Sequence, residues 1–392
     1  MSPPGRARVS MDDMEAIRAA HLFEIPEGIT YLNCSYMSPQ LKSVTAAGLD
    51  AVRIKSMPWT LTAAEWFTST EQLRALAGKV LGTGTDSVAI IPAASYGLAI
   101  AAANVTVSAG SSIVLLAETF PSIAYTWREA ARKHDATIVT VVRDPETGWT
   151  DAVLRAIDSR TAVVCVPRCH WADGSTVDLV RVGERARQVG AALVIDASQS
   201  FGAVPLDIGR IQPDFLVSVG YKWQLGPYGL GYLYASPKWQ QVGVPIEQSW
   251  LPRQGSDDFT RVADYSDEFQ PGARRFDMGE FTQFILAPMA AAALRQILDW
   301  GIASIEQSIS HLTEEIVQRA LAAGYLVAPA EQRSKHMLGI RFRGGLPAKL
   351  PTALAAAKVY VSIRGDSVRM SPHLYNTSGD IDRLFAAIAS CV

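Results

Sequence analysis

From about residue 87 the sequence alternates short, β-branched apolar runs with longer, alanine-rich amphipathic runs. A buried parallel strand is typically a continuous apolar run, whereas a surface helix keeps one polar face. The alternation therefore predicts an α/β fold, with a mostly parallel sheet covered by helices and with ligands at the carboxyl ends of the strands. The predicted strands are SVAII (87–91), SIVLL (112–116), ATIVTVV (136–142), TAVVCV (161–166), ALVID (192–196) and DFLVSV (214–219), and the predicted helices include SIAYTWREAARKH and VDLVRVGERARQVG.

The chain of 392 residues is longer than a single hydrophobic core usually holds, which is about 250 to 300 residues. The sequence is polar and irregular over about 245–278, and long helices are predicted over about 282–323, before a short α+β pattern ends the chain. We therefore expect a flexible N-terminal tail at 1–15, an N-terminal segment and large ligand-binding domain at 16–250, and a small C-terminal domain at 251–392.

Composition excludes several classes of protein. Hydrophobic residues make up 48% of the chain, charged residues 19%, and the formal net charge is -2, which argues against disorder and against a nucleic-acid partner. No apolar run approaches the length that spans a bilayer, and the first residues lack the apolar stretch of a signal peptide. We expect a soluble, cytoplasmic protein without a membrane partner.

The chain contains four cysteines, which are too few and too scattered for a disulfide framework. Cys165 and Cys169 have no second cysteine pair with which to complete a zinc site, so no metal is predicted.

One lysine lies in an apolar setting. Lys222, in SVGYKWQLGPYGLGYLY, lies between a predicted strand and a glycine-rich loop, and no other charge occurs between Asp214 and Lys238. Burial disfavours the charged form of an amine and lowers its pKa, which makes it a nucleophile able to form a Schiff base with a carbonyl. The alternative is a lysine at a strand end whose ammonium group reaches solvent.

Two further motifs follow predicted strands. Asp196 ends ALVID and Gln199 comes three residues later; a carboxylate at the tip of a buried strand needs a cationic partner, and a protonated pyridine nitrogen would be one. The alternative is a helix cap. Ala93, Ala94 and Ser95 precede a predicted helix, where backbone N–H groups and a hydroxyl could bind a phosphate dianion, although they would also suit an ordinary helix start.

These motifs stand in a recognisable order along the chain. AASYG, ETFPSIAYTW, CHWADGSTVDL, VIDASQSFGAVPLDI, PDFLVSVGYKWQLGPYGLGYLY and VRMSPHLYNTSGDIDRLFAAI together resemble class V of the fold-type I pyridoxal phosphate (PLP) enzymes, over roughly residues 28–390. Within that class the chain is most similar to the kynureninase, isopenicillin-N-epimerase-like and cysteine-desulfurase-like group. The resemblance implies a large domain with a mostly parallel seven-stranded sheet and helices on both faces, a smaller α+β C-terminal domain, and a homodimer with a shared active site.

The resemblance also implies the roles of the residues that bind the cofactor. Lys222 matches the Schiff-base lysine, Asp196 the partner of the pyridine nitrogen, and Gln199 the donor to the phenolic oxygen of the ring. Phe120 occupies the place of the aromatic residue that stacks on the ring. Tyr221 matches the residue beside the lysine that reaches the phosphate.

Further matches concern the phosphate, the substrate and the partner subunit. Ala94, through its backbone, and Ser95, through its hydroxyl, match the phosphate loop. Arg369 matches the arginine that holds the substrate carboxylate in a bidentate fork. In this family the site lies at a dimer interface, so Glu280 and Thr282, in MGEFTQF, are expected to come from the partner subunit.

The sequence also departs from the family pattern. Desulfurases carry a reactive cysteine shortly before the carboxylate arginine, whereas residues 362–371 contain none, which disfavours persulfide chemistry. Trp171 stands where desulfurases have asparagine and kynureninases an aromatic residue, consistent with a bulkier or less polar substrate pocket. Asn33, with Cys34 and Tyr36, falls where family members bring an N-terminal segment over the site, and a substrate contact is predicted for Asn33.

The sequence thus predicts a PLP-dependent enzyme that acts on a small amino acid through an external aldimine and a Cα carbanion, with an aminotransferase placed first. Kynureninase-like cleavage, a carbon–sulfur lyase and an epimerase are the alternatives, and a non-catalytic protein of the same fold is a remote one. These residues predict that a Cα carbanion forms, but they do not indicate which of these reactions follows from it.

Overall fold

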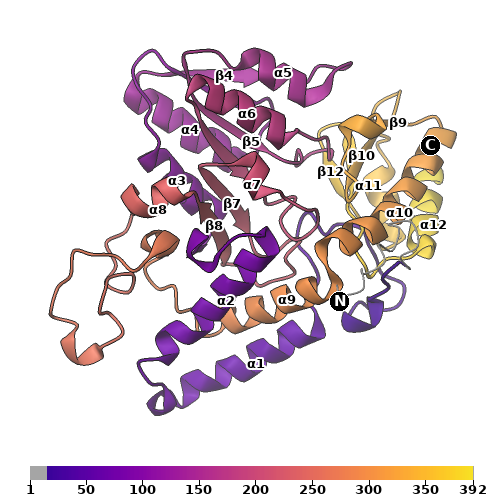
Figure 1. Cartoon of the computed structure of the whole chain (residues 1–392). Coiled ribbons are helices and arrows are strands. Elements are labelled where there is room, and N and C mark those ends of the chain that lie inside the picture. Colours follow the sequence, from indigo (N-terminus) through magenta and orange to yellow (C-terminus); the bar gives the residue numbers. More distant parts are fainter. Residues whose placement is uncertain (1–15, 392) are drawn as a thin grey trace, which may run out of the picture.

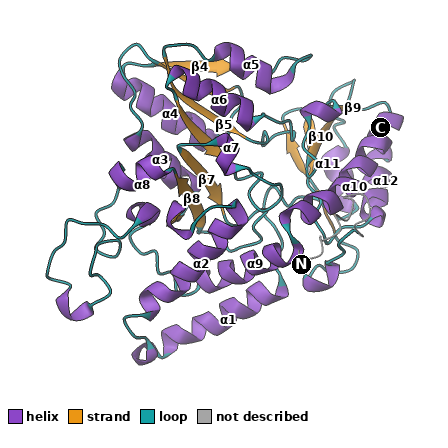
Figure 2. Cartoon of the chain, viewed as in Figure 1, coloured by secondary structure: helices purple, strands orange, loops and turns teal. Residues whose placement is uncertain are grey.

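The computed structural model describes residues 16–391. The tail predicted at 1–15 lies outside the described residues. The centre of the molecule is a seven-stranded sheet, which Figures 1 and 2 show running through its middle. In spatial order the strands are β2 (Val88–Ile91), β8 (Gly231–Ala235), β7 (Phe215–Val219), β6 (Ala192–Asp196), β5 (Thr161–Pro167), β3 (Ser112–Leu116) and β4 (Thr137–Val141).

The sheet is mostly parallel, as predicted. Strand β8 pairs antiparallel with both of its neighbours, β2 and β7, and the remaining strands all run in the same direction. Strand β8 was not among the strands predicted from apolar runs, because GYLYA follows closely on the glycine-rich stretch after Lys222. Its side chains are buried on both faces of the sheet: Tyr232 packs on one face and Leu233 on the other.

Side chains alternate between the two faces of the sheet, and each face is covered by helices. In β3, Val114 and Leu116 face one hydrophobic cluster, whereas Ile113 and Leu115 face the other. The first face packs against α2 (Glu65–Leu81), α5 (Gly148–Ala156), α6 (Leu179–Val189), α7 (Ile208–Ile211) and α9 (Leu286–Trp300). The second packs against α3 (Ala94–Asn104), α4 (Pro121–His134) and α8 (Pro237–Val242).

A smaller unit carries its own sheet and its own core. Its strand order is β12 (Ser362–Arg364), β13 (Ser367–Met370), β10 (Leu338–Arg341) and β9 (Leu326–Val327), with every neighbouring pair antiparallel. The helices α10 (Ile302–Ala322), α11 (Leu350–Ala356) and α12 (Ser378–Ala389) contribute to the same hydrophobic cluster. This unit lies to one side of the large sheet in Figure 1.

Two segments cross the predicted domain boundary. Strand β1 (Thr30–Tyr31) pairs in parallel with β11 (Val359–Tyr360) of the small unit, whereas α9 packs beside α1 (Lys42–Ser56) and α2 within the core of the large sheet (Figure 1). Helix α9 begins at Leu286, a few residues later than expected from the sequence. The boundary near residue 251 stays a prediction.

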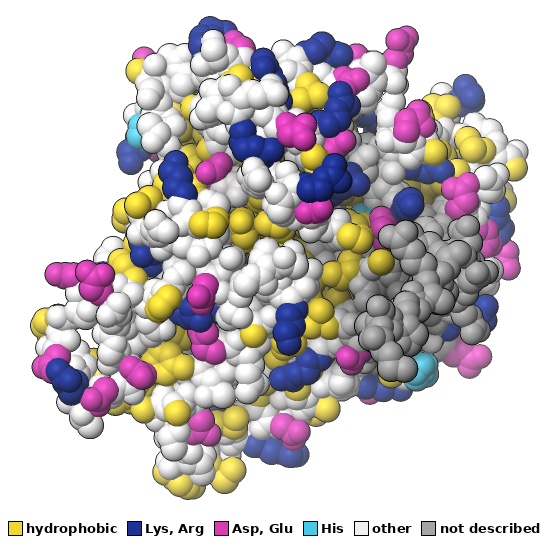
Figure 3. Space-filling model, in the orientation of Figure 1, with side chains coloured by type: hydrophobic (Ala, Val, Ile, Leu, Met, Phe, Trp, Pro, Cys, Tyr) yellow, Lys and Arg dark blue, Asp and Glu magenta, His cyan; other side chains and the backbone are white. Residues whose placement is uncertain are grey.

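The surface in Figure 3 shows Lys and Arg side chains interspersed with Asp and Glu. Within residues 16–391, no helix combines the length and the apolar character needed to cross a bilayer.

Candidate active site

The sequence-predicted residues lie where parallel strands end. Asp196 is the last residue of β6, and Lys222 follows β7 by three residues; these two strands are adjacent and parallel. Ala94 begins α3, directly after β2. Gly97 lets α3 approach the sheet closely, since a Cβ atom there would lie 2.6 Å from a methyl group of Val217. The topology therefore brings segments more than a hundred residues apart to the same edge of the sheet.

A single cavity at this edge gathers most of the predicted cofactor site. Seven of the predicted residues line it: Ala94, Phe120, Trp171, Asp196, Gln199, Tyr221 and Lys222. Cys169, Ser198 and Val219 also line it. Its walls thus combine aromatic rings with one amine and one carboxylate, which suits a flat polar ring with a carbonyl group.

Lys222 is an activated amine in this cavity. Its side chain is only 8% exposed, and Nζ lies 5.6 Å from the ring centroid of Phe120 and 5.8 Å from that of Tyr221. Burial lowers the pKa of Lys222 to about 8; Asp196 opposes this shift, and the cations Arg369 and Arg364 add to it.

Asp196 is a buried carboxylate at a strand tip. Its Oδ1 accepts a hydrogen bond of 2.9 Å from the backbone N–H of Ser198, and within residues 16–391 it forms no ion pair. A buried carboxylate without a counter-ion is costly, so this one suits a cationic partner bound in the cavity.

Gln199 is held by hydrogen bonds on both sides of its amide. Nε2 donates to the carbonyl of Ser35 at 3.1 Å, and Oε1 accepts from the indole N–H of Trp223 at 2.9 Å. One amide hydrogen of Nε2 remains for another acceptor. The N-terminal segment around Ser35 therefore lies directly against the cavity, as predicted for the segment containing Asn33, Cys34 and Tyr36.

The predicted phosphate end has the expected helix start. Ala94 lines the cavity, and Ser95, in the first turn of the eleven-residue α3, is exposed. Unpaired N–H groups and the positive end of the helix dipole favour an anion there.

Arg369 lies behind the cavity as a buried cation. It is only 2% exposed; one guanidinium nitrogen donates to the carbonyl of Trp171 at 2.5 Å and the other to Ser362 Oγ at 3.2 Å. Its Nε has no partner among the described residues, and no carboxylate there pairs with it. Burial, together with the nearby Arg364, lowers the pKa of Arg369 to about 9. Asn33 supports this group, because its Oδ1 accepts from Ser362 Oγ at 2.8 Å.

Aromatic side chains form the entrance. Phe120 and Trp171 pack edge to face, with ring centroids 5.7 Å apart and planes at 82°. Trp171 is fixed by its indole N–H, which donates to the carbonyl of Glu118 at 2.7 Å. Phe120 is 39% exposed, so its ring can stack on a planar ligand without first unpacking from the core.

Thr282 and Glu280, which were predicted to belong to a site, and two histidines close to site residues in the sequence lie outside this cavity. The hydroxyl of Thr282 donates to the carbonyl of Trp66 at 2.9 Å, so in this chain it serves packing, and its contribution to a partner's site stays a prediction, as does that of Glu280. His170 stacks on Trp149 with centroids 5.3 Å apart and lines a different cavity. His373 is fully buried among Trp223, Trp300 and Tyr375.

Arg364 is a residue near the cavity that was not predicted from the sequence. Its guanidinium carbon lies 5.7 Å from the Trp171 ring centroid, and its charge acts on both Lys222 and Arg369. The signal was present in SIRGDSVRMS: a hairpin turn at Gly365 and Asp366 puts Arg364 and Arg369 on the same face of two paired strands.

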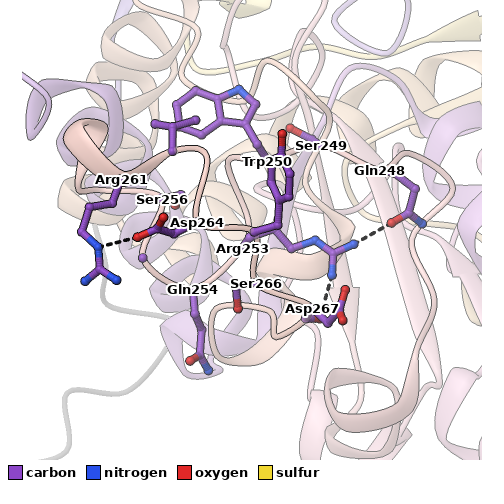
Figure 4. Close-up of a pocket in the computed structure, with 13 residues that line it drawn as sticks. Gln248, Ser249, Trp250, Arg253, Gln254, Ser256, Arg261, Asp264, Ser266 and Asp267 are labelled. Carbon is purple, nitrogen blue, oxygen red and sulfur yellow. Dashed lines mark hydrogen bonds and ion pairs between the residues drawn. The ribbon is translucent and has the colours of Figure 1, made fainter.

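A second hollow, formed by the loop at 248–267, is a poor candidate for chemistry (Figure 4). Its arginines are already engaged within the loop: Arg253 donates to the side chain of Gln248 and to the carbonyl of Asp267, and Arg261 forms an ion pair with Asp264.

Comparison with known proteins agrees with this geometry. The family model "Aminotransferase class-V" matches residues 60–384. Among curated proteins, the chain is 26% identical to the uncharacterized aminotransferase YcbU of Bacillus subtilis, over 87% of this chain and 88% of that protein. It is 23% identical to isopenicillin N epimerase of Streptomyces clavuligerus, over 81% and 83% of the two chains.

Solved structures share the fold at low identity. A cysteine desulfurase of Thermococcus onnurineus superposes with a TM-score of 0.79 and 18% identity, covering 99% of both chains. The cystine C–S lyase C-DES, in complex with cysteine persulfide, has a TM-score of 0.81 and 18% identity, covering 93% of this chain and 98% of that one.

Proposed function

Because the chain belongs to the aminotransferase class-V family of PLP-dependent enzymes, we propose that it is an aminotransferase of a small α-amino acid. The observation that carries this proposal is the cavity that holds a depressed-pKa lysine and a buried, unpaired carboxylate, backed by a buried arginine without a counter-ion. The amine, the carboxylate and the guanidinium match three groups of a PLP–amino-acid pair, which are the carbonyl carbon, the pyridine nitrogen and the α-carboxylate.

The cavity residues fit PLP, and each has a distinct task. PLP, when bound, supplies an aldehyde that condenses with amines and a ring that withdraws electrons. Asp196 would hold the pyridine nitrogen, Gln199 the phenolic oxygen, and Phe120 one face of the ring. Ala94, Ser95 and Tyr221 would receive the phosphate.

Lys222 would act twice. Its neutral amine would condense with the aldehyde of the cofactor, with loss of water, and once displaced by the amino group of the substrate, the free Nζ would accept and hold the proton from the substrate Cα. Arg369 would orient the substrate through its carboxylate, and Asn33 would act on Arg369 through Ser362. Trp171 would close the substrate side of the pocket.

The thiols of the site do not favour sulfur transfer. Burial raises the pKa of Cys34 and raises that of Cys169 to about 12, so both are protonated at neutral pH. Residues 362–371 contain no cysteine. Carbon–carbon cleavage, carbon–sulfur cleavage and epimerisation remain the alternatives, since they need the same residues.

The test is a single-turnover reaction of the holoenzyme with each of a panel of amino acids. An aminotransferase forms one equivalent of 2-oxo acid per active site, with loss of the visible absorption of the cofactor. Formation of the other enantiomer, or of a fragment of the substrate side chain, would assign the enzyme to an epimerase or a lyase and refute the aminotransferase.

A first prediction concerns pH. The amine of Lys222 is reactive only when neutral, and its pKa is lowered to about 8, so addition of PLP to the cofactor-free protein should accelerate as pH rises through about 8 and level off above it. Free lysine, with a pKa near 10.4, is the reference. Stopped-flow absorbance measures both; a midpoint in the protein near that of free lysine would contradict the lowered pKa.

A second prediction concerns Asp196. Asp196→Asn should lower kcat about 10- to 100-fold, which corresponds to the loss of one charge-assisted hydrogen bond in the transition state. Thermal unfolding of the cofactor-free variant separates this effect from a folding defect. Unchanged turnover would mean that another group keeps the pyridine nitrogen protonated.

We further propose a homodimer with a shared active site, in which the segment around Glu280 and Thr282 reaches the partner's cofactor and Thr282 exchanges its hydrogen bond to Trp66 for that contact. Molecular mass in solution tests the assembly, and a mixed dimer of Thr282→Ala and Lys222→Ala chains tests the shared site. The cytoplasmic location and the lack of a nucleic-acid partner stay predictions.

A further inference from the structure

Two arginines contact Trp171, which lines the cavity, and both extend from the same face of the small sheet. Strands β12 and β13 pair so that Ser362 lies opposite Arg369 and Arg364 opposite Ser367. Directly opposed residues share a face, and residues two apart on one strand share it too. Arg364 and Arg369 therefore point to the same side, while Val368 and Met370 point into the core of the small unit.

Neither arginine has a carboxylate partner within residues 16–391. Arg364 donates to the carbonyl of its neighbour Ile363, and its buried Nε has no hydrogen-bond partner there. The nearest acidic residue in sequence, Asp366, is paired with Arg341 at 2.8 Å. Arg369 makes only the neutral contacts described above.

The two cations repel each other and Lys222. Each of them lowers the pKa of Lys222, and Arg364 also lowers that of Arg369, which places all three charges within one electrostatic neighbourhood. Like charges gathered in a partly buried site destabilise the ligand-free state, so the site favours anions. One α-carboxylate satisfies one guanidinium fork and leaves the other unpaired.

We propose that the substrate is an α-amino acid whose side chain ends in a second carboxylate, which Arg364 binds while Arg369 binds the α-carboxylate. This inference rests on the proposed function, because it assumes an amino acid bound at Arg369. The planar guanidinium of Arg364 lies against Trp171, which limits its motion and preorganises a bidentate contact. Trp171 therefore borders the substrate side chain between the two anion positions.

The test compares acids with their isosteric amides on the PLP-loaded enzyme. Aspartate is paired with asparagine and glutamate with glutamine, and kcat/KM is measured for each by 2-oxo acid release. The wild-type enzyme should prefer one of the acids over its amide, and Arg364→Gln should reduce that preference about 10- to 100-fold, the range for one charge-assisted contact. Arg364→Lys, which keeps the charge without the fork, should lie between the two.

The control is Arg343→Gln, an exposed arginine of the same unit whose Nε donates to the carbonyl of Gly324. It should leave the acid-to-amide ratio unchanged. A wild-type enzyme that turns over neutral amino acids without preferring either acid overturns the inference and leaves the proposed function intact. An Arg364→Gln enzyme with an unaltered ratio, or with equal losses for acid and amide, also overturns it. If no amino acid reacts at all, the proposed function itself fails.

Discussion

Replacing Lys222 by alanine is expected to lower kcat by about 10⁴-fold or more. The variant loses both the amine that attaches the cofactor and the base that moves the substrate proton, and a positioned base alone contributes about 10²- to 10⁴-fold. No other amine lines the cavity, whose remaining side chains are aliphatic, aromatic, amide, hydroxyl or thiol groups, and the one carboxylate, Asp196, is assigned to the pyridine nitrogen. Steady-state 2-oxo acid release measures the loss.

Borohydride reduction identifies the residue directly. In the wild-type holoenzyme, mass mapping of the reduced adduct should find the cofactor on Lys222, and in the variant no reduced adduct should form, although PLP can still bind without a covalent link. Lys238→Ala is the matched control, since this exposed lysine lies over Trp239, 4.3 Å from its ring centroid, and outside the cavity. An adduct on any other lysine would contradict the assignment.

The buried strands could be predicted because they are continuous apolar runs. SIVLL and ALVID coincide with β3 and β6, and the others differ from the observed strands by one or two residues. Strand β8 could not be found in this way, because its identity depends on pairing with β2 and β7. That pairing joins segments far apart in the sequence and reverses the direction of the chain.

The cavity residues could be placed because the carboxyl ends of parallel strands meet at one edge. Asp196 ends β6, and Lys222 follows the neighbouring parallel strand β7 by three residues. This placement is enough to bring the two side chains to the same edge of the sheet. The hydrogen bonds that orient Gln199 could not be predicted from the sequence. Its partners, the carbonyl of Ser35 and the indole of Trp223, are brought to it only by the tertiary fold.

The hairpin segment SIRGDSVRMS contains a pattern from which the position of Arg364 could have been predicted, although it was not. If the stretch KVYVSIRG (358–365) were one continuous strand, nothing in it would indicate that Arg364 pairs with the strand of Arg369 across a turn. The structure breaks that stretch into β11 and β12, and the hairpin from β12 to β13 fixes which side chains share a face. Which residues share a face of the small sheet depends on the register of its strands. That register, and with it the common face of Arg364 and Arg369, could not be predicted from the local sequence of one strand alone.

Arg369→Lys is expected to raise KM at least about tenfold for an amino-acid substrate while leaving the visible spectrum of the holoenzyme unchanged. A lysine retains the charge but loses the planar pair of donors that a carboxylate needs, and it cannot reach Trp171 and Ser362 at the same time as the substrate. The bidentate contact forms on binding and persists in the transition state, so its loss is expected in KM more than in kcat.

The amine that lacks the α-carboxylate is the matched control substrate for this variant. The turnover of this amine is expected to be weak with the wild-type enzyme and equally weak with Arg369→Lys. The amine has no carboxylate with which to bind the two guanidinium donors of Arg369. If KM for the amino acid were unchanged, the α-amino-acid class would have to be abandoned. The assignment of PLP as the cofactor would stand, because it rests on Lys222, Asp196 and Gln199. These three residues line the cavity, whereas Arg369 does not.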